Sequence, residues 1–308
     1  MEGAAIQHVL LDHCPHQART LLELSGADVA RFLQGLLSAD IDALARGAAV
    51  PATLLSVKGK IISELIVLRG DGGELSLLAP RERVDEVAQL LDRHIIMDDV
   101  AIQRRDDIAV ALVFRPGASE APELALDAGV AGYRTIHPAP GLLVLGDPSA
   151  LARLGGGAPE AAPEVFTRHR VATAAPAWGF EITPDKFPPE VGFVEAVSYS
   201  KGCYMGQEPL ARIHARGQVN RVMVRVRATT AVLPGAEGPV ELDDIDRSGI
   251  GRWTTWVHDD RDVIGLAIVH RKRAVVGARL SAGELGEVEV TSGPLGDDLG
   301  VGDRHTKA

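Results

Sequence analysis

One short stretch, "SKGCYMGQEPLAR", gathers the residue types that a reactive site needs. It holds Cys203, one of only two cysteines in the chain, and Lys201 stands two positions before it. The thiolate is the reactive form of cysteine, and both a nearby lysine and a helix N-terminus favour it. Pro209 is tolerated in the first turn of a helix and Gly217 can end one, so the spacing predicts a helix that begins just after the cysteine. The stretch predicts an accessible, reactive Cys203; the alternative is a tight turn whose cysteine only packs.

The same region carries an excess of positive charge. Between residues 201 and 227 six lysines and arginines stand against Glu208 alone, in a chain whose formal net charge is −10. Arginine pairs with carboxylates through two parallel hydrogen bonds, so Arg212, on the predicted helix, is a candidate to receive an anion. Arg225 and Arg227 alternate on a predicted strand, and we expect them to be solvated.

Composition limits the class of protein. The chain has 308 residues, 46% hydrophobic and 24% charged, which is typical of a globular protein with about two domains. Its acidic balance argues against direct binding of nucleic acid or an anionic membrane. Two cysteines are too few for a disulfide framework, and no run of 18 apolar residues is present. We therefore expect a cytoplasmic protein.

Residues 12–16, "DHCPH", bring His13, Cys14 and His16 together near the start of the chain. These side-chain types can bind a metal ion, but structural metal sites usually combine two such clusters. We therefore expect the grouping to be incidental and predict no metal site.

Local patterns predict a mixture of helices and strands. Apolar residues at helical spacing predict helices from Val29 and from Val84, and Ser25 with Asp28 resembles a capping box before the first. Asp71-Gly72 is typical of a hairpin turn. Strands and helices do not alternate strictly, which favours the α+β class. From about residue 218, short β-rich runs between glycine, proline and aspartate predict a small barrel or sandwich.

The central stretch also carries a resemblance. "KGCYMGQEPLAR" resembles the signature K-G-C-Y-x-G-Q-E-x-x-A-R of the YgfZ family of folate-binding proteins, which are related to the glycine-cleavage T-protein. Three further stretches are similar in the same order: "LSGADVARFLQGLLSADIDAL", "SVKGKIISELIVLRGDG" and "APAWGFEITPDKFPPEVGFVEAVSY". Together they cover most of residues 20–225.

The resemblance implies a fold. We expect two intertwined α+β domains of the ferredoxin-like, T-protein type, a small C-terminal β-barrel, and a central channel for tetrahydrofolate or a one-carbon derivative. The expected boundaries are 1–105 for the first domain, 106–217 for the second, which carries the motif, and 218–295 for the barrel. We expect the tail, 296–308, to be disordered.

The resemblance also implies a function, namely folate-linked assembly or repair of iron–sulfur clusters in client enzymes. Its partners would be those clients or other assembly proteins, and the chain would act as a monomer without nucleic acid or membrane. The residues expected to carry the chemistry are Cys203, Lys201 and Glu208. Those expected to bind the folate are Lys58, Lys60, Trp178, Glu181, Gly202, Tyr204, Gly206, Gln207 and Arg212.

Two departures keep other functions open. Where the T-protein has an Asp-Asp pair, this chain has Ser63 and Glu64, which we expect to form an ordinary strand pair with one side chain outward. Ala172 stands where the T-protein has the glutamate that holds the pterin, so Glu181 or Glu195 would have to replace it. The alternatives are a folate-dependent aminomethyltransferase of the T-protein type and a non-catalytic folate-binding module linked to tRNA modification.

Overall fold

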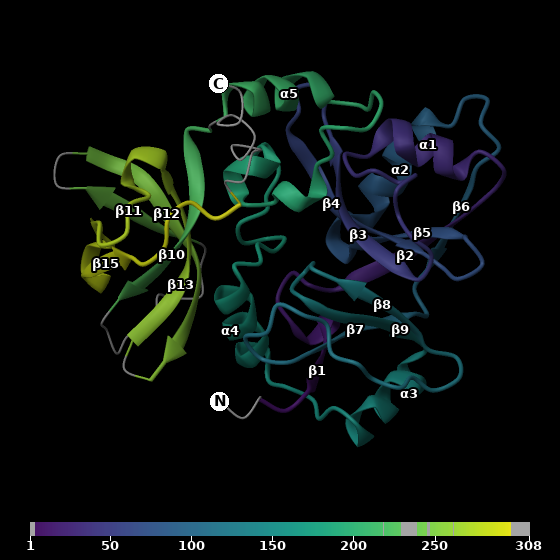
Figure 1. Ribbon diagram of the computed structural model, residues 1–308, viewed down its shortest axis with the longest axis horizontal. Helices are drawn as coiled ribbons and strands as arrows, with labels where there is room; N and C mark the ends of the chain where they lie inside the picture. The colour runs from purple at the N-terminus through teal and green to yellow at the C-terminus, as the bar shows by residue number, and fades with distance from the viewer. Residues whose placement is uncertain (1–3, 218, 229–238, 245–246, 261, 297–308) are drawn as a thin grey trace, which may run out of the picture.

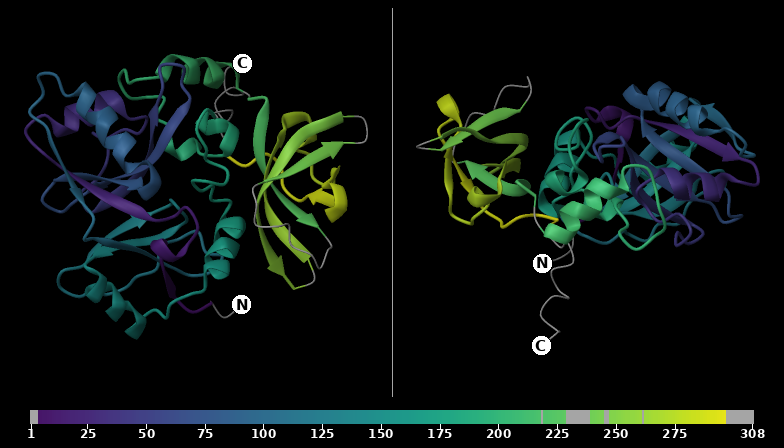
Figure 2. Two further views of the ribbon diagram at one scale, coloured as in Figure 1. Left: turned by 180° about the vertical axis from the view of Figure 1, so that it is seen from behind. Right: turned by 90° about the horizontal axis from the view of Figure 1, so that it is seen from above.

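The computed structural model describes residues 4–217, 219–228, 239–244, 247–260 and 262–296. The tail predicted to be disordered lies outside them, except for Gly296. The chain forms a body of two α+β lobes with a separate closed β-barrel at one side (Figures 1 and 2). The predicted fold class is confirmed.

One nine-stranded sheet runs through both lobes, in the order β1-β7-β9-β8-β3-β4-β5-β2-β6. Its halves meet at a single parallel pair, Ala48 of β3 with Arg134 of β8, and the other strand pairs are antiparallel. Because β1 pairs with β7 while β2 pairs with β5 and β6, the lobes are intertwined. The strands are β1 (Gln7–Leu10), β2 (Arg19–Ser25), β3 (Ala48–Leu55), β4 (Ile61–Arg69), β5 (Leu75–Pro80), β6 (Ala101–Arg105), β7 (Ala109–Phe114), β8 (Ala131–Thr135) and β9 (Gly141–Gly146).

Five α-helices accompany the sheet in the described part of the body: α1 (Val29–Leu36), α2 (Val84–His94), α3 (Pro148–Leu151), α4 (Pro163–Thr173) and α5 (Gln207–Arg216). Short 3-10 turns are η1 (Leu11–His13), η2 (Arg81–Arg83), η3 (Ala152–Gly156), η4 (Pro188–Val191) and η5 (Val194–Ala196).

The start of α1 differs from the prediction. Its apolar stripe is buried as expected, but Ser25 and Asp28 do not form a capping box. Instead, Asp28 accepts a hydrogen bond from the backbone N–H of Asp99 at 2.8 Å, and Asp99 accepts one from Ala27 at 3.0 Å. The side chain of Asp28 thus contacts a residue that is 71 positions away in the sequence. No local pattern in the sequence indicates such a contact.

Successive side chains of β2 point alternately into two hydrophobic cores of the body. Leu22 faces the core under α1 and α2, whereas Leu21 faces a second core between the two halves of the sheet. Side chains of neighbouring residues in a strand point to opposite faces, so one strand supports both cores.

The barrel closes in the order β10-β13-β12-β11-β14-β15, which confirms the prediction for the C-terminal region. Its strands are β10 (Arg221–Ala228), β11 (Val240–Asp244), β12 (Arg247–Asp259), β13 (Asp262–His270), β14 (Arg279–Ser281) and β15 (Glu287–Val290), with the turns η6 (Arg271–Arg273) and η7 (Gly283–Leu285). Within the described part of the chain, no helix has the length and apolar character that a membrane span requires.

Arg225 was expected to be solvated, and this was wrong. It donates hydrogen bonds to the carbonyl oxygens of Val171 and Ala172, at 2.8 and 2.7 Å. These carbonyls lie at the C-terminus of α4, where the last carbonyl groups have no N–H partner within the helix. The guanidinium of Arg225, which belongs to the barrel, therefore caps α4. Arg227 is half-exposed and lies 3.8 Å from a carboxylate oxygen of Asp262.

Candidate functional site

Cys203 is a free, exposed cysteine on the loop before α5. The helix starts and ends where the sequence predicted, with Gly206 and Gly217 as its caps, both in the left-handed region. The thiol therefore lies in front of a helix N-terminus, open to a reaction partner.

The side chain of Lys201 holds this loop against the C-terminus of α1. Its ammonium donates three hydrogen bonds, to the carbonyl oxygens of Gln34 at 2.7 Å, Leu37 at 2.6 Å and Ala39 at 2.6 Å. These carbonyls lie at and just beyond the C-terminus of α1, where a cation is favourable. Burial lowers the pKa of Lys201 to about 8. Since all three ammonium protons are used, the lysine holds the loop in place rather than pairing with Cys203.

Two glycine turns, far apart in the sequence, touch beside this loop. Gly206 has a φ of +78° and Gly59 one of +72°, where side chains are strained. A Cβ added to Gly206 would lie 2.5 Å from the carbonyl oxygen of Ser56, and one added to Gly59 would lie 3.0 Å from Cβ of Pro209. The Lys58-Gly59-Lys60 turn is thus packed against the start of α5.

The two lysines of this turn differ in their surroundings. Lys58 is exposed. Lys60 places its Nζ 3.4 Å from the centre of the Phe187 ring and 3.8 Å from a carboxylate oxygen of Glu190. The turn thus presents the exposed ammonium group of Lys58 beside the motif.

The remaining motif residues fall into a buried and an exposed group. Tyr204 is buried and donates a hydrogen bond to the carbonyl oxygen of Ser198 at 3.2 Å. Gln207 is half-buried, and Gly202 has open space around it. The carboxylate of Glu208 lies 3.8 Å from the guanidinium of Arg212, with both side chains mostly in solvent.

Trp178 and Glu181 are buried, in the segment after α4. The indole N–H of Trp178 donates to Oε1 of Glu82 at 2.5 Å, so its ring is packed rather than free to stack on a ligand. Glu181 accepts hydrogen bonds from Arg170 Nη2 at 2.6 Å and from the hydroxyls of Thr254 and Thr255, both at 2.6 Å. It borders a cavity of about 390 Å³ next to the barrel, but its oxygens are already engaged.

Ser63 and Glu64 are both buried, so the expectation of one outward side chain was wrong. The reason is that β4 is covered on both faces. Glu64 places one carboxylate oxygen 2.5 Å from Nη2 of Arg19 and the other 2.5 Å from Nε2 of His137. Burial alone would raise the pKa of Glu64, but the charges of His137 and Arg19 outweigh it and lower that pKa.

The "DHCPH" stretch lines a polar cavity of about 570 Å³, which the sequence did not indicate. His16 lies 3.2 Å from a carboxylate oxygen of Glu82, and Arg81 lies 2.8 Å from one of Asp12. Burial raises the pKa of Cys14, which also borders the cavity, to about 12. The lining residues are Asp12, His13, Cys14, Pro15, His16, Ala18, Arg81 and Glu82. Among the described residues, no three potential metal ligands are gathered into a group.

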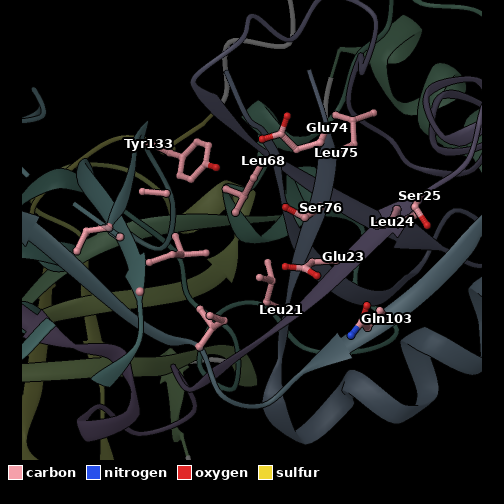
Figure 3. Close-up of a pocket in the computed structure, with 16 residues that line it drawn as sticks. Leu21, Glu23, Leu24, Ser25, Leu68, Glu74, Leu75, Ser76, Gln103 and Tyr133 are labelled. Carbon is pink, nitrogen blue, oxygen red and sulfur yellow. The ribbon is translucent and has the colours of Figure 1, made fainter. Parts of the chain in front are cut away.

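A larger cavity, of about 650 Å³, lies between β2 and β5 on one side and β8 and β9 on the other (Figure 3). None of the predicted site residues lines it, and Cys203 borders neither this cavity nor the polar one. The helix of the motif, α5, and the strand before the polar cavity, β1, lie at opposite ends of the body (Figure 1). The structure thus separates the exposed thiol from the cavities.

Comparison with known proteins agrees with the fold and with the resemblance found in the sequence. No family model matches the chain. Two curated relatives are named tRNA-modifying protein YgfZ. The one from Klebsiella pneumoniae (strain 342) is 28% identical over 247 residues, 72% of this chain and 73% of that protein. The one from Yersinia pestis (strain Pestoides F) is 28% identical over 241 residues, 72% of each chain.

The structure is also similar to the glycine cleavage system aminomethyltransferase T from Bartonella henselae. The TM-score is 0.76 at 19% identity, over 96% of this chain and 87% of that one. That likeness concerns the fold. With the curated relatives, it leads to one conclusion: the chain is similar to the YgfZ proteins over most of its length, and its fold is that of the glycine-cleavage aminomethyltransferase T.

Proposed function

We propose that this chain is a YgfZ-type folate-binding protein that helps to assemble or repair iron–sulfur clusters in client enzymes, with Cys203 as its functional thiol. The observation that carries the proposal is that Cys203 is exposed on a loop whose backbone is fixed. Lys201 ties that loop to α1, and the contact between Gly206 and Gly59 ties it to the β3–β4 turn. A thiol held outward in this way suits contact with another protein, because little ordering is required when the partner arrives.

A folate fits best in the polar cavity around His16. The cavity volume of about 570 Å³ lies in the usual range for small ligands. Glu82 can accept hydrogen bonds from the adjacent N–H groups of a pterin, and Arg81 can pair with a carboxylate of the glutamyl tail. Glu82 also accepts the indole N–H of Trp178, but its pair with His16 and the pair of Arg81 with Asp12 are close to half-exposed, and such pairs are exchanged at little cost. Glu181, by contrast, is saturated by its neighbours.

The aminomethyltransferase alternative is less well supported. Glu64, at the position that matches the T-protein aspartates, is buried and its two oxygens are paired with Arg19 and His137. A carboxylate in such a network is not free to accept a proton from a substrate. We therefore favour an accessory role over one-carbon transfer.

The curated relatives are named for tRNA modification, which supports a link between this chain and that process. The net charge of −10 disfavours direct contact with RNA. We infer that the link runs through client enzymes that modify tRNA and carry iron–sulfur clusters. A non-catalytic, folate-binding module in the same process stays an alternative.

The role of Cys203 can be tested by complementation of a strain that lacks the gene. A Cys203→Ser copy is expected to leave the activities of iron–sulfur enzymes, and the level of modified tRNA, as low as in the deletion strain. A Glu123→Gln copy is the control and is expected to restore both, because that side chain is 93% exposed and lines none of the cavities described. Full restoration by Cys203→Ser would contradict the proposed role of the thiol.

Folate binding can be tested separately by calorimetry with tetrahydrofolate. Wild-type protein is expected to release or take up heat, and Glu82→Gln is expected to weaken binding about tenfold, the loss of a charged hydrogen bond. Glu123→Gln, in a side chain that is 93% exposed, serves as the control. No binding by wild type would reject folate as the ligand. Equal binding by Glu82→Gln would reject the polar cavity as its site.

A further inference from the structure

The cavity in Figure 3 has ligand-binding features of its own, apart from Cys203 and the polar cavity. We propose that it binds a small organic cation with an apolar body, of the arylalkylamine class. Its volume of about 650 Å³ lies well inside the range of small-molecule sites.

One wall of the cavity is a row of side chains across four strands. Strand register places Gln103 of β6 opposite Glu23 of β2, Glu23 opposite Ser76 of β5, and Ser76 opposite Leu68 of β4. Directly opposed residues of antiparallel strands share one face of the sheet, so this row forms a continuous surface. It presents a carboxylate, a hydroxyl, an amide and an aliphatic group to one ligand.

The opposite wall comes from the second lobe. Ala131 and Tyr133 of β8 lie two residues apart and share a face with Leu145 of β9, which is opposite Ala131 in the register. Tyr133 and Glu74 stand on opposite sides of the cavity in Figure 3. A flat ligand can therefore lie between an aromatic ring and a carboxylate.

The polar row interrupts a face that is otherwise apolar. Along β2 the residue two positions before Glu23 is Leu21, which is buried in the core between the lobes. A glutamate that faced a closed core would be costly unless it were paired. Glu23 is instead half-buried at the point where the two sheet halves separate, so the cavity continues the core with a polar end.

The charge of the cavity favours a cation. Glu23 forms an ion pair with Arg105 at 2.8 Å, and Arg105 also forms one with Asp107. The carboxylate charge of Glu23 is therefore already balanced within the protein. Glu74 forms no ion pair with any described residue, and it is exposed. Burial raises the pKa of Tyr133, and the negative charges of Glu74 and Asp71 raise it further. An anion would be repelled here, whereas an ammonium group beside Glu74 would complete an ion pair.

Tryptamine is a suitable probe because it joins an apolar ring system to one ammonium group. Calorimetry is expected to show binding of tryptamine, weaker binding of neutral 3-methylindole, and no binding of indole-3-acetate. Glu74→Gln is expected to weaken the binding of tryptamine about threefold to fivefold, the loss expected for an exposed ion pair. The affinity for 3-methylindole is expected to stay unchanged. A preference for the acid over the amine, or equal tryptamine binding by Glu74→Gln, would overturn the assignment of charge.

A variant that fills the cavity tests whether the ligand binds there. Ala131 is an exposed lining residue, so Ala131→Trp is expected to preserve the melting temperature while abolishing binding of both tryptamine and 3-methylindole. Ala43→Trp, at an exposed alanine outside the lining, is the matched control and is expected to bind like wild type. Unchanged binding by Ala131→Trp, or no binding of tryptamine to wild type up to about 10 mM, would overturn the proposal.

Discussion

Two buried carboxylates in the described part of the chain, Glu64 and Glu181, are each in contact with more than one polar side chain. Glu64 lies between Arg19 and His137, and Glu181 accepts from Arg170 and two threonines. Removing two charges from water is costly, and the cost is offset only when the remaining lone pairs and protons are also satisfied. These two carboxylates therefore act as parts of a polar framework rather than as free acids.

Glu64→Gln tests this arrangement. The amide leaves the buried guanidinium of Arg19 without its counter-charge, so the free energy of unfolding is expected to fall by about 3–5 kcal/mol at neutral pH. The pKa of Glu64 is lower in the folded chain than its ordinary value of 4.5. The carboxylate therefore stabilises the fold fully above pH 4.5, and this contribution is lost as the pH falls below it.

Urea unfolding of wild type and Glu64→Gln at neutral and at acidic pH is the measurement. The difference between the two proteins is expected to be large at neutral pH and to narrow below pH 4.5. Glu123→Gln, whose side chain is 93% exposed, controls for loss of a charge as such. A difference that widens on acidification would show that Glu64 is protonated in the folded chain.

At the scale of elements, the motif loop is held by contacts with two others. Lys201 connects it to the end of α1, and Gly206 lies against the turn between β3 and β4. Exposed loops are usually mobile, because few contacts hold their backbone. Here the contacts fix the backbone on both sides of Cys203 and leave its thiol in solvent.

Two glycines of the same loop give a matched pair of variants. Gly206→Ala introduces a side chain at a φ of +78°, where strain alone costs about 1–3 kcal/mol, and its Cβ would meet the carbonyl oxygen of Ser56 at 2.5 Å. Gly202→Ala meets nothing within 4 Å. We expect Gly206→Ala to lower stability by at least that amount and to change the alkylation rate of Cys203. Gly202→Ala should change neither, and equal effects of both would contradict the packing described.

The sequence was sufficient for elements whose signals are local. The apolar stripe of α1 and the glycine that ends α5 are fixed by spacing within one segment, and both were found as predicted. The carbonyl groups to which Lys201 and Arg225 donate hydrogen bonds were not predictable in this way. Each caps a helix from a distant part of the chain, and a cation in a sequence does not indicate which carbonyls it will meet. The cavity of Figure 3 depends on how two sheet faces separate, and the polar cavity on the approach of η1 and η2, so no single segment encodes either.

At the scale of the whole molecule, the barrel is joined to the body through α4 and the segment after it. Arg225 of β10 caps α4, and the hydroxyls of Thr254 and Thr255 in β12 donate to Glu181, which is itself paired with Arg170 of α4. Figure 2 shows the barrel at one side of the body, away from α1 and α2. Glu181 thus adds a buried polar contact to a junction that also has a shared apolar cluster, in which Val171 of the body packs with Met223 and Ile268 of the barrel.

Glu181→Gln should weaken that coupling. The amide leaves Arg170 buried without a counter-charge and loses the strength of two charge-assisted hydrogen bonds to the barrel. In hydrogen exchange followed by mass spectrometry, peptides from β10 and β12 are expected to exchange faster than in wild type, because the barrel opens as a unit. Peptides from β3 and β4, in the sheet of the body, should keep their protection. Arg225→Gln, which removes hydrogen bonds to α4 but no buried ion pair, should produce a smaller effect of the same kind. Faster exchange in β3 and β4 alone would mean that Glu181 stabilises the body and not its junction with the barrel.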